Sequence, residues 1–303
     1  TRPELTEEYE LLIEEGRHPI VEKLIGHNSF VKNGIDMTEN ESFIILTGPN
    51  MAGKSTYMKR SAMIIIMAQI GCYVPAKYAK IGVVDKIFTR IGASDDIVSG
   101  QSTFMVEMSE VANIVNSATE RSFIILDEVG RGTSTFDGIS IAWAISEYIH
   151  DHIKAKTIFA THYHELTDME KKYKNAVNYR IEVKEKQDSV IFLRKIVRGG
   201  ADKSYGIEVA RLAGLPDEIL ANSRKILKSL EARRAIIEKK IKGEQLTLFG
   251  ELSQKTEEEE KEERINELRD RIYLAVRELD VENMTPIEAL LKLNQLKKES
   301  SFN

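Results

Sequence analysis

The sequence predicts an α/β fold with a mostly parallel central sheet flanked by helices. Three short, largely apolar segments between residues 42 and 165 are typical of buried strands: 42–47, 122–126 and 157–160. Stretches whose apolar residues have helical spacing separate these segments. Because such strands need cover on both faces, the alternation favours a sheet with helices on both sides.

Composition limits the class of protein. The 303 residues are 42% hydrophobic, which allows one large domain or two ordinary ones. A formal net charge of −5 argues against a chain that coats nucleic acid by bulk charge. The single cysteine, Cys72, excludes an internal disulfide and favours a cytoplasmic location. The longest apolar run, 62–68, is too short to span a bilayer, so we expect no membrane partner.

Local signals predict the other elements of the first two hundred residues. Residues 1–40 mix short apolar runs with turn signals such as Asn33-Gly34, which indicates strands and loops. Helical periodicity predicts helices over three ranges: 54–70, 106–119 and 138–150. Two alternating segments, 180–183 and 189–193, lie on either side of the turn-prone residues 186–188 and predict a β-hairpin.

Beyond residue 200 the sequence predicts helices and a charged linker. One short helix is expected over 205–213, and a second begins after the Gly214-Leu-Pro216 break, where Pro216 and the two acidic residues after it suit a first turn. Lys, Arg and Glu dominate residues 231–270, which favours a solvated helix or linker. Residues 285–288 form a capping box with proline at the first helical position, so a last helix is expected there.

A phosphate-binding loop is the most specific motif. Residues 48–55 fit the pattern Gly-x-x-x-x-Gly-Lys-Ser/Thr and lie between a predicted buried strand and a predicted helix, as this motif requires. The flanking elements disfavour the alternative of an incidental glycine-rich turn. Lys54 can reach the β- and γ-phosphates of ATP, and Ser55 can bind Mg²⁺. The residues expected to contact the nucleotide are Gly48, Pro49, Asn50, Met51, Ala52, Gly53, Lys54, Ser55 and Thr56.

Polar residues follow the other two predicted strands. Asp127 and Glu128 end the second strand, where Asp127 would hold Mg²⁺ and Glu128 would polarise an attacking water molecule. The alternative is an acidic strand end that faces solvent. His162 follows the third strand and could contact the γ-phosphate. The histidines could instead be paired metal ligands, His150 with His152 and His162 with His164, but neither pair has a third ligand at suitable spacing.

Taken together, the motifs resemble the ATPase domain of the MutS family of DNA mismatch-repair proteins. The segments that carry the resemblance follow in family order: 16–19, 47–56, 102–108, 127–135, 160–162, 203–210 and 212–216. They span nearly all of residues 16–230. Ala52 stands where many members have glycine, and both residues are small enough for the loop.

The resemblance implies an ABC-type ATPase, a P-loop NTPase fold whose two sites are composite across a homodimer. It implies Mg²⁺-dependent hydrolysis of ATP to ADP and phosphate. The implied catalytic residues are Glu128, Lys54, His162 and, from the opposite subunit, Ser102. Phe30 would stack on adenine, against the alternative of ordinary core packing. The loop over 130–135 would cross the interface. Without the resemblance, Ser102 would be interpreted as a helix N-cap, and it can be both.

The tail carries three further resemblances. The helices around Gly214-Leu-Pro216 have the spacing of a DNA-binding helix-turn-helix, but the MutS resemblance and the apolar face of the second helix favour dimerisation. Gln245-Leu-Thr-Leu-Phe249 resembles the peptide that binds the replication sliding clamp, with anchors Gln245, Leu246, Leu248 and Phe249. The alternative is a small staple onto the ATPase domain. The helix from Thr285 resembles a tetramerisation element, or it folds back onto its own chain.

These observations divide the chain into four expected units: an ATPase domain over 1–200, a helix-turn-helix dimerisation element over 201–232, a charged linker with the clamp peptide over 233–280, and a helical oligomerisation element over 281–303. A start at Thr1 rather than Met suggests a piece of a longer protein. The resemblance implies MutL and the sliding clamp as partners, and DNA through domains that precede this piece. The alternatives are a dimerisation and clamp-tethering module with little turnover, or the MutS-like branch that suppresses recombination.

Overall fold

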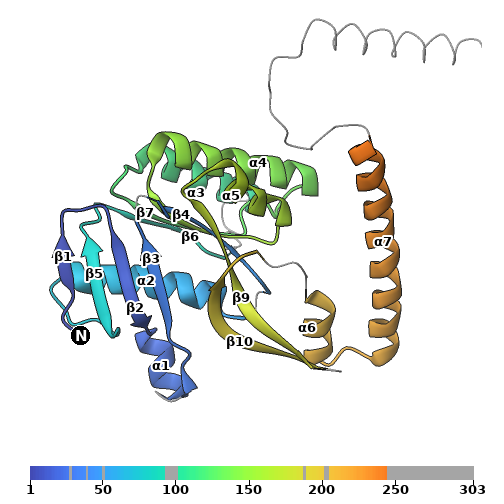
Figure 1. The fold of residues 1–303 in the computed structure, drawn as a ribbon, viewed down its shortest axis with the longest axis horizontal. Helices are drawn as coiled ribbons and strands as arrows, with labels where there is room; N and C mark the ends of the chain where they lie inside the picture. The colour runs from blue at the N-terminus through green and yellow to red at the C-terminus, as the bar shows by residue number, and fades with distance from the viewer. Residues whose placement is uncertain are drawn as a thin grey trace, which may run out of the picture. The chain divides into compact units, whose positions relative to one another are not determined.

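The computed structural model describes the backbone of most of the chain as far as residue 243 (Figure 1). The described residues are 1–26, 29–38, 40–49, 52–92, 102–186, 189–200 and 205–243, of which 185, 186, 189 and 231–243 are described by their backbone alone. The chain divides into two units, Thr1–Lys225 and Ile226–Asn303. The described part of the second unit is helical.

A six-stranded sheet forms the centre of the first unit. Its strand order is β10-β9-β4-β8-β7-β6. The strands are β4 (Phe43–Thr47), β6 (Ile87–Arg90), β7 (Phe123–Asp127), β8 (Lys156–Ala160), β9 (Ala176–Lys186) and β10 (Ser189–Arg198). All neighbouring pairs are parallel except the β9–β10 hairpin. The structure therefore confirms both the mostly parallel sheet and the predicted hairpin.

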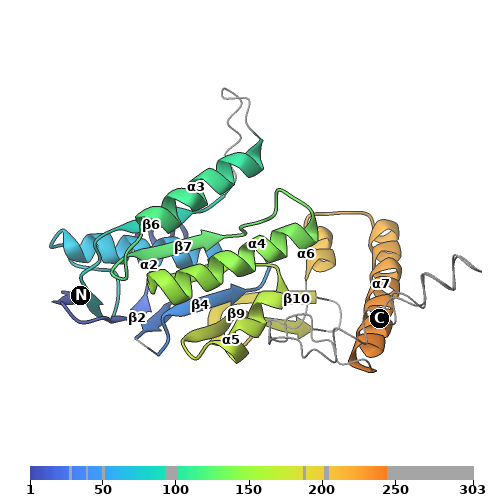
Figure 2. The ribbon, with the colours of Figure 1, turned by 90° about the horizontal axis from the view of Figure 1, so that it is seen from above.

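Helices cover both faces of this sheet (Figures 1 and 2). Along β4, Ile44 and Leu46 pack in one apolar cluster with α2 (Lys54–Gln69). The alternate residues Phe43 and Ile45 pack in a second cluster with α3 (Thr103–Ser117) and α4 (Thr135–Tyr148). Successive side chains of a strand point to opposite faces, so a strand that is apolar throughout serves two cores.

A smaller sheet precedes the central one and has the strand order β1-β5-β2-β3. Its strands are β1 (Glu4–Thr6), β2 (Leu11–Gly16), β3 (Asn33–Met37) and β5 (Tyr78–Gly82). Inward-facing residues of β2 and β3 join the same cluster as α2, which ties the small sheet to the helix of the phosphate-binding loop. Between β2 and β3 lies α1 (Pro19–Ile25), capped by His18, whose Nδ1 accepts a hydrogen bond from the amide of Val21 at 3.4 Å.

The end of the first unit contains shorter elements. A π-helical turn (Ile149–Ile153) extends α4, and a 3₁₀ turn (His164–Asp168) and α5 (Met169–Lys172) follow β8. Helix α6 (Gly206–Leu212) is followed by Gly214, whose φ of +88° is left-handed, and by the start of α7 (Asp217–Gly243). No helix within the described residues is long and apolar enough to cross a membrane.

Candidate active site

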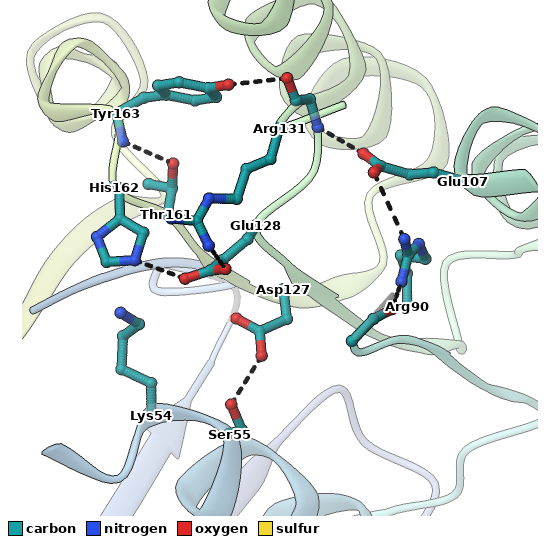
Figure 3. Close-up of polar contacts among 12 residues, drawn as sticks. Lys54, Ser55, Arg90, Glu107, Asp127, Glu128, Arg131, Thr161, His162 and Tyr163 are labelled. Carbon is teal, nitrogen blue, oxygen red and sulfur yellow. Dashed lines mark hydrogen bonds and ion pairs between the residues drawn. The ribbon is translucent and has the colours of Figure 1, made fainter. Parts of the chain in front are cut away.

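The loop that follows β4 leads into α2, and the ammonium group of Lys54 points from the start of that helix toward Glu128 and His162 (Figure 3). Gly48 and Gly53 adopt φ values of +131° and +106°, a region that glycine enters without strain. Lys54, the first residue of α2, is 1% exposed and donates a hydrogen bond to the carbonyl of Gly48. Burial lowers the pKa of Lys54 to about 8, although Glu128 and Asp127 act in the opposite direction. A buried amine thus lies at the start of α2, where a bound phosphate would need it.

A hydroxyl and a carboxylate meet beside this lysine. The Ser55 hydroxyl, in the first turn of α2, donates to Oδ2 of Asp127 at 2.8 Å. Asp127 ends β7, which lies next to β8 and one strand away from β4. Burial raises the pKa of Asp127, and the hydrogen bond from Ser55 opposes that shift. Hard oxygen ligands of this kind are those that Mg²⁺ prefers, so Ser55 and Asp127 fit a magnesium site.

Glu128 is held by two cationic or potentially cationic neighbours. Its φ of +58° is left-handed, and its amide donates to the carbonyl of Ala160 at 2.9 Å. One carboxylate oxygen lies 2.5 Å from Nε2 of His162, and the other pairs with Arg131. Burial favours the neutral acid, but the hydrogen bond and charge of His162, with Arg131, bring the pKa of Glu128 down to about 2. The carboxylate is therefore ionised and can orient a water molecule, but it is a weak proton acceptor in this arrangement.

Ser102 is the N-cap of α3, because its hydroxyl accepts from the amide of Met105 at 3.2 Å. This confirms the capping role that was expected beside its implied role in trans, and α3 begins at Thr103, earlier than its apolar spacing indicated. Phe30 is half-buried between α1 and β3, which does not distinguish stacking from packing. Asn50 and Met51 lie outside the described residues, as do the clamp peptide and the helix expected from Thr285.

The other histidines have ordinary neighbours. His150 pairs with Asp151 at 2.7 Å and lies against Tyr173, while the ring of His152 stacks on Tyr148. Within the described ranges, no cluster of three or more His, Cys, Asp or Glu side chains could hold a metal ion.

Three polar residues near the site were not identified from the sequence. Arg131 pairs with Glu128, and Glu107 and Tyr163 bind the peptide groups of Gly130. A signal existed for Glu107, which is a carboxylate among apolar residues of a predicted helix and is buried. The contacts of Arg131 and Tyr163 have no comparable sequence signal, since both residues lie in loops.

A parallel sheet, a glycine-rich loop leading into a helix, and a carboxylate at a nearby strand end define the P-loop class of α/β proteins. Residues 44–231 match the family described as MutS domain V. The chain belongs to this family.

The relatives are bacterial proteins named DNA mismatch repair protein MutS. That of Fusobacterium nucleatum is 60% identical over 297 residues, which cover 98% of this chain and 33% of the relative. That of Acetivibrio thermocellus is 53% identical over 305 residues, covering 99% of this chain and 34% of the relative. That of Caldicellulosiruptor saccharolyticus is 56% identical over 292 residues, which cover 95% of this chain and 33% of the relative. The chain thus spans about a third of the length of these relatives.

Proposed function

We propose that the chain binds and hydrolyses ATP, with Mg²⁺, as the ATPase part of a MutS-type DNA mismatch-repair protein. The observation that carries this proposal is the 2.8 Å hydrogen bond between Ser55 and Asp127 beside the buried Lys54. It joins the helix of the phosphate-binding loop to a strand end that supplies a carboxylate. A nucleotide bound with its metal ion requires this arrangement of a lysine, a hydroxyl and a carboxylate.

The residues divide the chemistry among them. Lys54 and the backbone amides at the start of α2 would hold phosphate oxygens, because the amides point outwards at a helix N-terminus. Ser55 and Asp127 would hold Mg²⁺, which neutralises phosphate charge when bound. Glu128 would orient the attacking water, and His162 and Arg131 fix the direction of its carboxylate.

A second copy of the chain would complete each site. Ser102 is exposed at the start of α3, at the far end of the helix from the core contacts of Ile114. Met105 beside it is 55% exposed, and Phe136 at the start of α4 is 77% exposed. Large exposed apolar side chains favour an interface. We assign the dimer contact to the helix-turn-helix over 201–232, sliding-clamp binding to Gln245–Phe249 and tetramer contacts to the helix from Thr285. MutL would be a further partner, and DNA would be bound by domains that precede this piece.

The proposal is tested by measuring Mg²⁺-dependent ATP hydrolysis over a wide range of chain concentrations. A composite site requires that the rate per chain rises with concentration until dimers are saturated. Sedimentation with and without ATP would show the same transition. A chain that binds no ATP, or that turns over none at any concentration, would contradict the proposal and favour a dimerisation and tethering module.

A further inference from the structure

The peptide groups of Gly130 are held on three sides. The amide of Gly130 donates to Oε1 of Glu107 at 2.5 Å, and its carbonyl accepts from the hydroxyl of Tyr163 at 2.9 Å (Figure 3). On the third side lies Gly138, the backbone oxygen of which would be 2.6 Å from a Cβ atom at position 130. The φ of Gly130 is +96°. The backbone just after Glu128 therefore has little freedom to move by itself.

Glu107 is itself fixed within α3. Its side chain is 7% exposed, and its second oxygen lies 3.4 Å from Nη2 of Arg90. Arg90 also pairs, through Nε, with Glu110 of the same helix at 2.9 Å. A buried carboxylate oxygen without a partner costs free energy, and here Gly130 and Arg90 supply a partner for each oxygen of Glu107. Glu107 thus joins α3 firmly to the loop after β7.

We propose that Glu107 is a positioning residue that couples the location of α3 to the geometry of Glu128. Ser102 caps the start of α3, and Gly130 lies in the chain between Glu128 and its partner Arg131. A shift of α3 would move the Gly130 peptide, and with it both ends of the Glu128–Arg131 pair. The inference rests on the proposed function, in which Ser102 serves the partner's site while Glu128 serves its own. Glu107 would then transmit occupancy of one site to hydrolysis at the other.

The chain offers a matched pair of variants. Glu107→Ala removes the acceptor of the Gly130 amide, whereas Glu110→Ala removes another carboxylate from the same arginine and the same helix without contacting Gly130. We expect Glu107→Ala to lower kcat about tenfold or more, with KM for ATP within about twofold, because the loss leaves a buried donor unpaired and misplaces Glu128. Glu107→Gln keeps an acceptor oxygen and should restore most of kcat. Glu110→Ala should resemble the wild type.

Hydrogen exchange tests the contact without ATP. In Glu107→Ala, the amide of Gly130 should exchange about tenfold faster, measured on a peptide that covers residues 127–135, and it should be unchanged in Glu110→Ala. If the exchange results are as expected but the wild type hydrolyses no ATP, the proposed function is wrong, although the contact between Glu107 and the Gly130 amide is confirmed. Faster exchange with normal kcat in Glu107→Ala overturns the coupling. Equal losses of kcat in Glu107→Ala and Glu110→Ala also overturn it.

Tyr163→Phe keeps the test decisive if Glu107→Ala does not fold. It removes only the hydroxyl that donates to the Gly130 carbonyl. We expect kcat to fall severalfold with an unchanged KM and a melting temperature close to that of the wild type. A kcat equal to that of the wild type, in a variant with a wild-type melting temperature, overturns the proposal.

Discussion

At Glu128, the neighbouring side chains decide what the carboxylate can do. His162 lies 2.5 Å from one oxygen and Arg131 pairs with the other, so the group is ionised and its direction is fixed. A general base works best when its pKa is near the working pH, and a pKa of about 2 is far from that range. Glu128 would therefore need to lose one of these partners before it accepts a proton. Until then we expect it to act by orienting water.

Replacing Glu128 with glutamine tests this role. Glutamine keeps the shape of the side chain and can accept a hydrogen bond, but it lacks the negative charge that would orient and polarise the attacking water. We expect ATP hydrolysis to fall about a hundredfold or more, with ATP affinity changed only a fewfold. Glu120→Gln, on an exposed turn, is the control and should hydrolyse ATP normally. Equal rates for the two variants would remove Glu128 from the mechanism.

The proximity of Ser55 to Asp127 could be predicted, because a loop motif and an apolar strand with an acidic end are local signals. The roles of both residues remain predictions. The contacts of Arg131 and Tyr163 could not be predicted in this way. They depend on a loop that turns back at Gly130, and neither side chain belongs to a spacing pattern that marks its partner.

Among the elements, α4 starts so close to the loop after β7 that only glycine fits at the crossing. A Cβ atom on Gly138 would lie 2.3 Å from the carbonyl oxygen of Gly130 and 2.4 Å from the hydroxyl of Tyr163. At Gly206, in α6, none of the described residues beyond its chain neighbours and its own helix backbone has an atom within 4 Å of such a position. The two helical glycines therefore have different tolerances for a methyl group.

We expect Gly138→Ala to lower the free energy of unfolding by about 1–3 kcal/mol, since the backbone atoms it meets cannot rotate away. Gly206→Ala should be neutral or slightly stabilising, because alanine favours the helix. Denaturant unfolding of the two variants measures both values. If Gly138→Ala were as stable as Gly206→Ala, this would contradict the conclusion that α4 lies too close to the loop after β7 for a side chain at position 138.

The cap of α1 makes stability depend on pH. Burial lowers the pKa of His18, and the charges of Lys59 and Arg60 act in the same direction. The unfolded chain then binds the proton more tightly than the folded chain, so stability falls as pH drops below about 6.5. Protonation of Nδ1 would also remove the acceptor for the amide of Val21.

Between pH 7.5 and pH 5.5, we expect the melting temperature of His18→Asn to fall less than that of the wild type, because asparagine caps a helix without titrating. The exposed His152, changed to asparagine, serves as the control and should keep the slope of the wild type. Identical slopes for the wild type and His18→Asn would show that this cap does not titrate in that range.

Among the strands, those with an unbroken apolar run could be predicted from the sequence, and the shorter ones could not. The strands β4, β7 and β8 lie within about a residue of their expected limits, because burial on both faces leaves an unbroken apolar run. Strand β6 has only four residues, and β5 is a short run paired with residues far earlier in the chain. Such short strands are stabilised by pairing with distant strands, and a local sequence pattern does not identify those partners.

For the whole molecule, the central question is whether one chain holds a complete site. The loop after β7 packs on the start of α3, where a Cβ atom on Gly132 would lie 2.8 Å from Cβ of Phe104. The loop and the start of α3 are therefore adjacent, and Ser102 and Met105 at the start of α3 are exposed. In a two-fold dimer that contacts through the start of α3, Ser102 of each subunit would enter the nucleotide site of the other. The same contact would therefore complete both sites.

Mixing two inactive variants tests this claim most directly. Glu128→Gln lacks the carboxylate that would orient water in its own site, and Ser102→Ala lacks the serine that it would give to its partner. Each variant alone should hydrolyse ATP far more slowly than the wild type. In an equal mixture about half of the dimers are hybrids, each with one complete site, so we predict recovery to about a quarter of the wild-type rate. A mixture no faster than its two components would contradict a site shared between chains.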